Sequence, residues 1–175
     1  MSELLSGFIG AVIATILSVI YLYFAEQWKL RTEIALEVAA YCDDIYDRLQ
    51  SMHGHKDTVY KHSGSGMHPD EYRANSHELS RLLKATKTHA KLEITYGASQ
   101  SVAALNELSH HFREIASLLM GATETDWSQK SQLVFEIFQT RIDPVRKDLQ
   151  RKLIDGTRVS AIAYDLFARF GRRVT

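Results

Sequence analysis

From Leu4 to Phe24 the chain carries no charged residue, and the segment reads LLSGFIGAVIATILSVIYLYF. A helix rises ~1.5 Å per residue, so this run is ~31 Å long, which matches the hydrocarbon core of a bilayer. Aromatic side chains, which favour the membrane–water interface, gather at its end between Tyr21 and Trp28. The run therefore predicts one N-terminal transmembrane helix, with residues 1–28 as a membrane anchor and the lipid bilayer as a partner.

A cleavable signal peptide is the alternative interpretation of the same run. Such a peptide needs a basic start, a shorter apolar core and small residues at the cleavage site. The only charged residue before the run is Glu3, and the residues that follow the run are bulky. The sequence thus favours an anchor that stays in the protein.

The basic residues beside the run predict its orientation. Lys29 and Arg31 follow it, and no lysine or arginine precedes it. The flank that is richer in lysine and arginine stays in the cytoplasm. The single cysteine, Cys42, agrees, since it forms no internal disulfide and suits a reducing compartment. We expect a single-pass protein of a bacterial-type inner or plasma membrane, with its N-terminus outside and residues 29–175 in the cytoplasm.

One face of the expected membrane helix consists of small residues. These residues are Ser6, Gly7, Gly10, Ala11, Ala14 and Ser18. Small residues four positions apart let helix backbones approach closely, and such packing drives helix association in lipid. The face therefore predicts a homo-oligomer. The alternative is chance, because glycine, alanine and serine are frequent in membrane helices.

Residues 29–175 read as an all-α domain, because the whole chain contains only two prolines and nine glycines. Apolar residues from Leu30 to Met52 recur at spacings of three and four, which is the pattern of one buried helix face. We expect this face either to continue the first helix without a break or to belong to a separate domain helix that follows a bend after the membrane segment. A flexible loop over residues 53–69 is expected to follow it. Four or five helices with short connections then predict an up-and-down cytoplasmic bundle.

Prolines and glycines predict several later boundaries. Pro69 suits the first turn of a helix that reaches Tyr96, with Leu79 and Ile94 on its apolar side. Two longer helices and a short last one follow. Pro144 lies inside the second of the longer ones, and we expect it to kink or divide that helix just before the proline.

No motif indicates catalysis or a cofactor. Four of the eight histidines fall within residues 53–69, but this segment also holds three glycines and lacks the rigid frame of a metal site. A glycine-rich phosphate loop is absent from the sequence. Cys42 reads as a buried hydrophobic residue, and Asp43 and Asp44 beside it oppose a nucleophilic role. A net charge of zero gives no attraction to nucleic acid. We expect no enzyme activity, no metal, no cofactor and no nucleic-acid partner.

A ribonuclease is the catalytic alternative. Arg48 and His53 enclose the segment RLQSMH. This spacing resembles that of the HEPN superfamily, helical ribonucleases whose arginine and histidine pair across a dimer for acid–base chemistry on RNA. The resemblance covers six residues and implies that His53 is the general base. The leucine after Arg48 departs from the family, which usually has a polar residue there.

The C-terminal segment combines apolar and basic residues. Val159 to Phe170 is amphipathic, and Arg169, Arg172 and Arg173 lie at its end. A basic amphipathic helix can lie on an anionic membrane surface, and these arginines are the expected membrane-surface residues. The alternative is a last bundle helix with a solvated basic end.

Three functions are compatible with this organisation. The first is a self-associating effector or accessory that perturbs the membrane or forms a pore. Its organisation, one span plus a helical cytoplasmic domain, resembles that of small membrane accessories of bacterial antiviral systems, including those that accompany RNA-targeting CRISPR nucleases. The second is a membrane-tethered scaffold or adaptor that recruits an unidentified cytoplasmic protein. The third is a HEPN-like membrane-bound ribonuclease.

Overall fold

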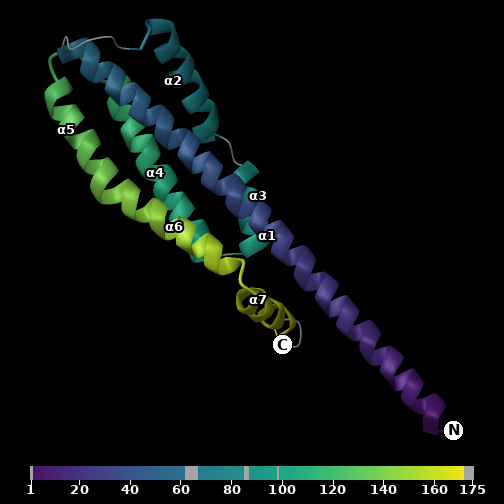
Figure 1. Cartoon of the computed structure of the whole chain (residues 1–175). Helices are drawn as coiled ribbons and strands as arrows, with labels where there is room; N and C mark the ends of the chain where they lie inside the picture. Colours follow the sequence, from purple (N-terminus) through teal and green to yellow (C-terminus); the bar gives the residue numbers. More distant parts are fainter. Residues whose placement is uncertain (1, 62–66, 85–86, 98, 172–175) are drawn as a thin grey trace. The chain divides into compact units, whose positions relative to one another are not determined.

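The computed structural model describes residues 2–61, 67–84, 87–97 and 99–171, with side chains described between Gly7 and Ala168 (Figure 1). These ranges consist of helices joined by short connections and contain no strand, as the all-α prediction requires. The elements are α1 Ser2–Lys61, α2 Pro69–Lys84, α3 Lys87–Tyr96, α4 Gln100–Met120, α5 Trp127–Ile137, the π-helix η1 Phe138–Ile142, α6 Asp143–Gly156 and α7 Val159–Gly171.

The chain forms two compact units. The terminal unit comprises Met1–Glu33 and Ile154–Thr175, and the central unit comprises Ile34–Leu153. The terminal unit thus combines the beginning of α1 with α7, which are distant in sequence. The central unit holds the rest of α1, α2 to α5, η1 and most of α6.

The first part of α1 is a long apolar helix that no described part of the chain buries. Its most apolar 18-residue stretch is 0% buried, and side chains such as Ile13, Leu17 and Leu22 are exposed. In water such a surface would be very unfavourable, since each fully buried leucine or isoleucine is worth about 1.5–3 kcal/mol. The helix is long and apolar enough to be a membrane span or a signal sequence.

The prediction that residues 53–69 form a loop is wrong for residues 53–61, because α1 continues as a helix to Lys61. The last two turns of α1 are held by packing. Trp127 of α5 lies against Tyr60, with the ring centroids 5.8 Å apart, and its indole N–H donates to the Asp57 carboxylate at 3.2 Å. These contacts outweigh the low helix propensity of Gly54. Residues 62–66 lie outside the described ranges.

The core of the central unit confirms the apolar face predicted for α1. Its buried members are Ile34, Val38, Tyr41, Ile45, Leu49 and Met52. The main partners from α4 are Leu105, Leu108, Phe112, Ile115 and Leu119, and those from α5, η1 and α6 are Val134, Ile142, Leu149 and Leu153. Leu30, the first residue of the predicted face, is exposed and belongs to the terminal unit.

The helix expected from Pro69 to Tyr96 is described as two, α2 and α3, on either side of residues 85–86, which lie outside the described ranges. Leu79 is buried as expected, but Ile94 is 79% exposed, so its predicted inward position is wrong. The inward face of α3 instead carries Leu92 together with the polar Thr88 and Thr95. A face with two threonines gives a weak apolar pattern, which explains the wrong assignment.

Pro144 interrupts its helix as predicted. In a regular α-helix its ring would clash with the carbonyl of Thr140, four residues earlier. The chain widens there into η1, in which the N–H of Asp143 donates to the carbonyl of Phe138. With α5, η1 and α6 counted as one interrupted rod, five helical rods follow α1 in the described ranges. The last of them, α7, groups with the beginning of α1 rather than with the central core.

Candidate functional site

The predicted small-residue face is open along its described length. Gly7, Gly10, Ala11, Ala14 and Ser18 are all exposed, and a Cβ atom added to either glycine would meet no atom within 4 Å. The side chain of Ser6 lies outside the described ones. Nothing in the described part of the chain covers this face, so another helix has room to approach its backbone.

Aromatic side chains mark the end of the apolar run. Tyr21 and Trp28 are exposed, and the rings of Tyr23 and Phe24 meet edge to face with their centroids 5.9 Å apart. Exposed tyrosine and tryptophan beside an apolar helix are typical of a membrane–water interface. Their position indicates where a bilayer around α1 would end.

Arg31 is buried beside this aromatic end, with 2% of its surface exposed. One guanidinium nitrogen, Nη2, donates to the Asp165 carboxylate of α7 at 2.7 Å, and Nη1 donates to the carbonyl of Gly156 at 2.9 Å. Sequence reasoning treated Arg31 only as an orienting charge. It missed the structural role because Arg31 and its partner Asp165 are 134 positions apart in the sequence. Arg31 therefore holds the two halves of the terminal unit together.

The basic residues predicted to contact a membrane surface are not described well enough to be located. Arg169 lies in α7, but its side chain is outside the described ones, and Arg172 and Arg173 lie outside the described residues. The described part of α7 does carry exposed apolar side chains, namely Val159, Tyr164 and Phe167, whereas Ile162 is buried.

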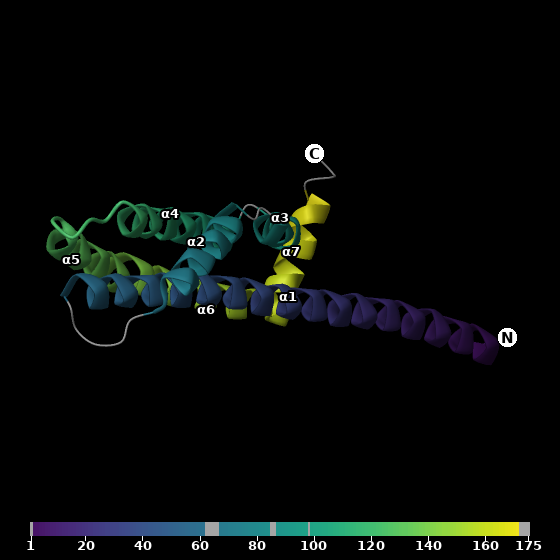
Figure 2. The same cartoon turned by 90° about the horizontal axis from the view of Figure 1, so that it is seen from above.

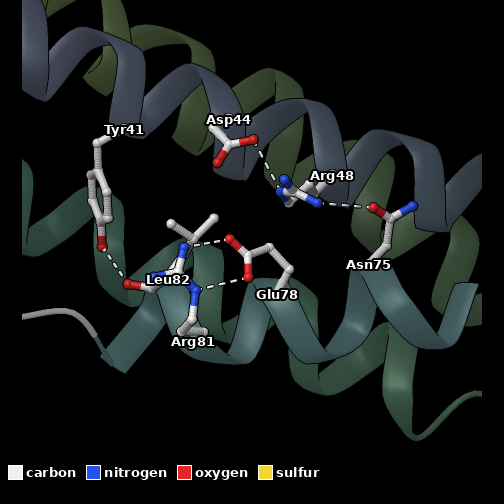
Figure 3. A network of polar contacts seen from close by, with 7 residues as sticks. All are labelled: Tyr41, Asp44, Arg48, Asn75, Glu78, Arg81 and Leu82. Carbon is white, nitrogen blue, oxygen red and sulfur yellow. Dashed lines mark hydrogen bonds and ion pairs between the residues drawn. The ribbon is translucent and has the colours of Figure 1, made fainter. Parts of the chain in front are cut away.

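The structure does not join Arg48 and His53, the candidate ribonuclease pair. The Arg48 guanidinium pairs with Asp44 one turn earlier and with Asn75 of α2, each at 3.0 Å (Figure 3). A separate bond joins the same two helices, in which the Tyr41 hydroxyl donates to the carbonyl of Leu82 at 3.0 Å. These bonds attach α1 to α2, so Arg48 acts as a structural link in this chain.

His53 lies toward α5 and has different partners. Its Nε2 is 3.0 Å from the Ser131 hydroxyl, and its ring lies 5.3 Å from that of Trp127, centroid to centroid. Burial lowers the pKa of His53, while the nearby Asp57 carboxylate acts in the opposite direction. His53 and Arg48 thus contact different helices, and within one chain they form no common acid–base site.

Other reactive side chains are in structural environments. Cys42 is buried, and this burial, followed by the charge of Asp43, raises the pKa of its thiol to about 12. The ring of His89 is bonded on both nitrogens, to Asn106 and to Ser109. Among the described residues, no three His, Cys, Asp or Glu side chains lie close enough to hold a metal ion.

A shallow groove of about 670 Å³ lies between α2 and α4. Its lining includes the apolar Leu83 and Met120 and the basic Lys84 and Arg113. The Arg113 guanidinium also donates to the carbonyl of Leu83 at 3.3 Å. No motif in the sequence indicated this groove, because its residues come from separate helices.

Comparison with known proteins adds no relative. No family model matches the chain, and neither a curated protein nor a solved structure matches it.

Proposed function

We propose that this chain is a single-pass membrane protein, anchored by the first part of α1, with its central unit in the cytoplasm. One observation carries the proposal: the apolar run is exposed from Gly7 to Leu22, and its most apolar stretch has no burial inside the protein. Such a helix needs lipid around it. The exposed Tyr21 and Trp28 at its end support an interface there, and the bulky residues after the run argue against cleavage.

The anchored chain self-associates through its small-residue face. In lipid the hydrophobic effect gives helices no reason to associate, so close backbone packing supplies the energy. Gly7 and Gly10 have open space where a second helix would lie, and Gly10, Ala14 and Ser18 recur every four residues. This spacing supports a homo-oligomer in which the small faces meet.

The function that we propose for this oligomer is that of a membrane-perturbing or pore-forming effector. The organisation, one span and a helical cytoplasmic unit, is that of a small accessory in an antiviral-type defence system. The central unit would then control assembly rather than catalyse a reaction. The support lies in the open small face and in the structural roles of Arg48, His53 and Cys42.

Leucine substitutions on the two faces of α1 test this function. Gly10→Leu and Ala14→Leu place bulk between the backbones, so we expect smaller oligomers in detergent and loss of any dye leakage or depolarisation that expression causes. Ile9→Leu and Ile16→Leu, on the opposite face, are the matched controls and should change neither. Leucine does not impair membrane insertion, so these variants test helix packing alone. If Gly10→Leu still assembles and causes leakage fully, the small-residue face is not needed for the function.

A scaffold that recruits a cytoplasmic protein is the second candidate, favoured by the groove between α2 and α4. Its apolar Leu83 and Met120 and its basic Lys84 and Arg113 suit an acidic amphipathic segment of a partner. Lys84→Glu together with Arg113→Glu would then abolish the phenotype while leaving oligomer size unchanged. If the protein is an effector, Gly10→Leu should abolish the phenotype, and Lys84→Glu together with Arg113→Glu should leave it unchanged.

A further inference from the structure

The arrangement of the terminal unit sets the place of α7 along α1. α7 lies beside α1 and crosses it steeply (Figures 1 and 2). The contact is fixed by Arg31, which reaches Asp165 in the middle of α7 and Gly156 just before it. If α1 runs along the membrane normal, a helix that crosses it lies along the membrane plane.

The height of this contact falls at the outer edge of the headgroup layer. Arg31 follows the last residue of the apolar run, Phe24, by seven positions, which is ~10 Å along a helix. The interfacial layer extends roughly 5–8 Å beyond the hydrocarbon core on each side. Trp28, an interfacial residue type, is exposed between the two positions. α7 is therefore held at or just beyond the level at which the bilayer ends.

α7 presents apolar side chains on two sides. Ile162 is 1% exposed and faces the protein, on the same side as Asp165. Val159, Tyr164 and Phe167 are 65%, 74% and 73% exposed and share a separate arc of the helix. An exposed valine, tyrosine and phenylalanine on one arc form an apolar stripe that suits an interface, as does the amphipathic tyrosine.

The charges near α7 complement an anionic surface. Arg158 is exposed just before the helix, although it pairs with Asp155 at 2.9 Å, and the sequence places three more arginines at or after the end of α7. Basic residues that flank an apolar arc are attracted to anionic lipid headgroups.

We propose that α7 is an interfacial helix, lying on the cytoplasmic surface of the bilayer with Val159, Tyr164 and Phe167 in the headgroup layer. The Arg31–Asp165 ion pair positions it there. This inference rests on the proposed membrane anchoring by α1. A protein with both elements has two membrane contacts, one across the bilayer and one along its surface.

Fluorescent labels in lipid nanodiscs test the two contacts separately. A single cysteine is introduced by Phe167→Cys or by Ile13→Cys and labelled with an environment-sensitive probe. Cys42 is buried with a raised thiol pKa, so the unsubstituted chain should label little, which is measured as the blank. Lipids that carry a nitroxide near the headgroup or deep in the acyl chain then report the depth of each probe.

The expected result is quenching of the probe at 167 by shallow nitroxides, and of the probe at 13 by deep ones. A probe from Ala168→Cys, on another side of α7, should be quenched less than that at 167. Adding phosphatidylglycerol to phosphatidylcholine nanodiscs should increase quenching at 167. Asp165→Asn removes the charge that pairs with Arg31 and should reduce quenching at 167 while leaving that at 13 unchanged.

Other outcomes separate the two proposals. If the probe at 13 is quenched but that at 167 stays accessible to aqueous iodide, α7 is not interfacial although α1 is anchored. If neither probe is quenched by lipid nitroxides, the membrane anchoring itself fails. The probe at 167 could also be shielded from iodide without being quenched by the lipid nitroxides. If this shielding increases with the density of protein in the nanodiscs, a second copy of the chain covers Val159, Tyr164 and Phe167, and the inference is overturned.

Discussion

At the scale of single residues, buried polar side chains in this chain act by joining helices. Arg31 is nearly inaccessible and depends on Asp165, and removing one partner of a buried pair leaves an uncompensated charge. The Asp165 side chain is 37% exposed, so losing it should cost much less than losing Arg31. Arg48 and His53 act similarly in the central unit, where they attach α1 to α2 and to α5.

The ribonuclease alternative is tested at Arg48 and His53. Because each side chain is bonded to a different helix, we expect Arg48→Ala together with His53→Ala to leave any cellular phenotype intact. The variant should lose about 1–2 kcal/mol of stability through its lost hydrogen bonds. Membrane insertion and oligomer size are measured alongside. Loss of the phenotype, or of RNA cleavage by the purified protein, with normal assembly would restore the catalytic interpretation.

His53 also predicts a pH dependence of stability. Burial lowers its pKa, so the folded protein binds this proton less tightly than the unfolded chain, where histidine titrates near 6.5. As the pH falls through about 6.5, the unfolded chain takes up the proton first and the free energy of unfolding decreases.

We expect His53→Gln, which can keep a hydrogen bond to Ser131, to flatten part of this decrease. Urea unfolding in detergent, repeated at several pH values between about 5 and 7.5, measures it. The pKa of His55 is also lowered, by burial and by Lys56, so His55→Gln is the companion variant. A pH dependence unchanged in both variants would contradict the assignment.

At the scale of elements, two glycines with equally open surroundings should respond oppositely to alanine. Gly54 lies within α1, and Gly97 follows α3 with a φ of +67°; a Cβ at either would meet nothing within 4 Å. Gly54→Ala should stabilise the protein by about 0.5–1 kcal/mol, because alanine has the higher helix propensity. Gly97→Ala should destabilise it by roughly 1–2 kcal/mol, because alanine disfavours the left-handed region.

Chemical unfolding of both variants under the same conditions gives the comparison. The measurement also tests the end of α1. If residues 53–61 were a loop, Gly54→Ala would give no stabilisation, and the helix to Lys61 would be wrong.

Local patterns predicted the elements that local forces determine. The apolar face of α1 from Ile34 to Met52 follows from the spacing of its residues, and the interruption at Pro144 follows from the chemistry of proline. The end of α1 was placed wrongly because Trp127, far along the chain, stabilises a turn that contains glycine. The partner of Arg31 was missed for the same reason, since no periodicity relates Arg31 to Asp165.

At the scale of the whole molecule, two experiments test the anchoring of the chain and the side of the membrane that holds the central unit. The exposed apolar part of α1 is compatible with an anchor or with a signal sequence. An intact mass of the membrane-extracted protein distinguishes them, since cleavage would remove the N-terminal residues. We expect the full mass, with the protein resistant to carbonate extraction.

Orientation follows from the charges that the insertion machinery meets before folding. Arg31 ends up buried against Asp165, but during insertion the chain is unfolded and both Lys29 and Arg31 count, whereas acidic residues contribute little. A reporter fused after Thr175 should therefore be active only in the cytoplasm. Arg31 must stay for folding, so the test changes the other charges: Lys29→Gln, combined with Ser2→Lys and Glu3→Lys, reverses the bias and should move part of the population to the opposite orientation. Lys29→Gln alone is the control and should leave most chains unchanged. Periplasmic activity of the wild-type fusion would place the central unit outside the cytoplasm and remove the basis for a cytoplasmic partner.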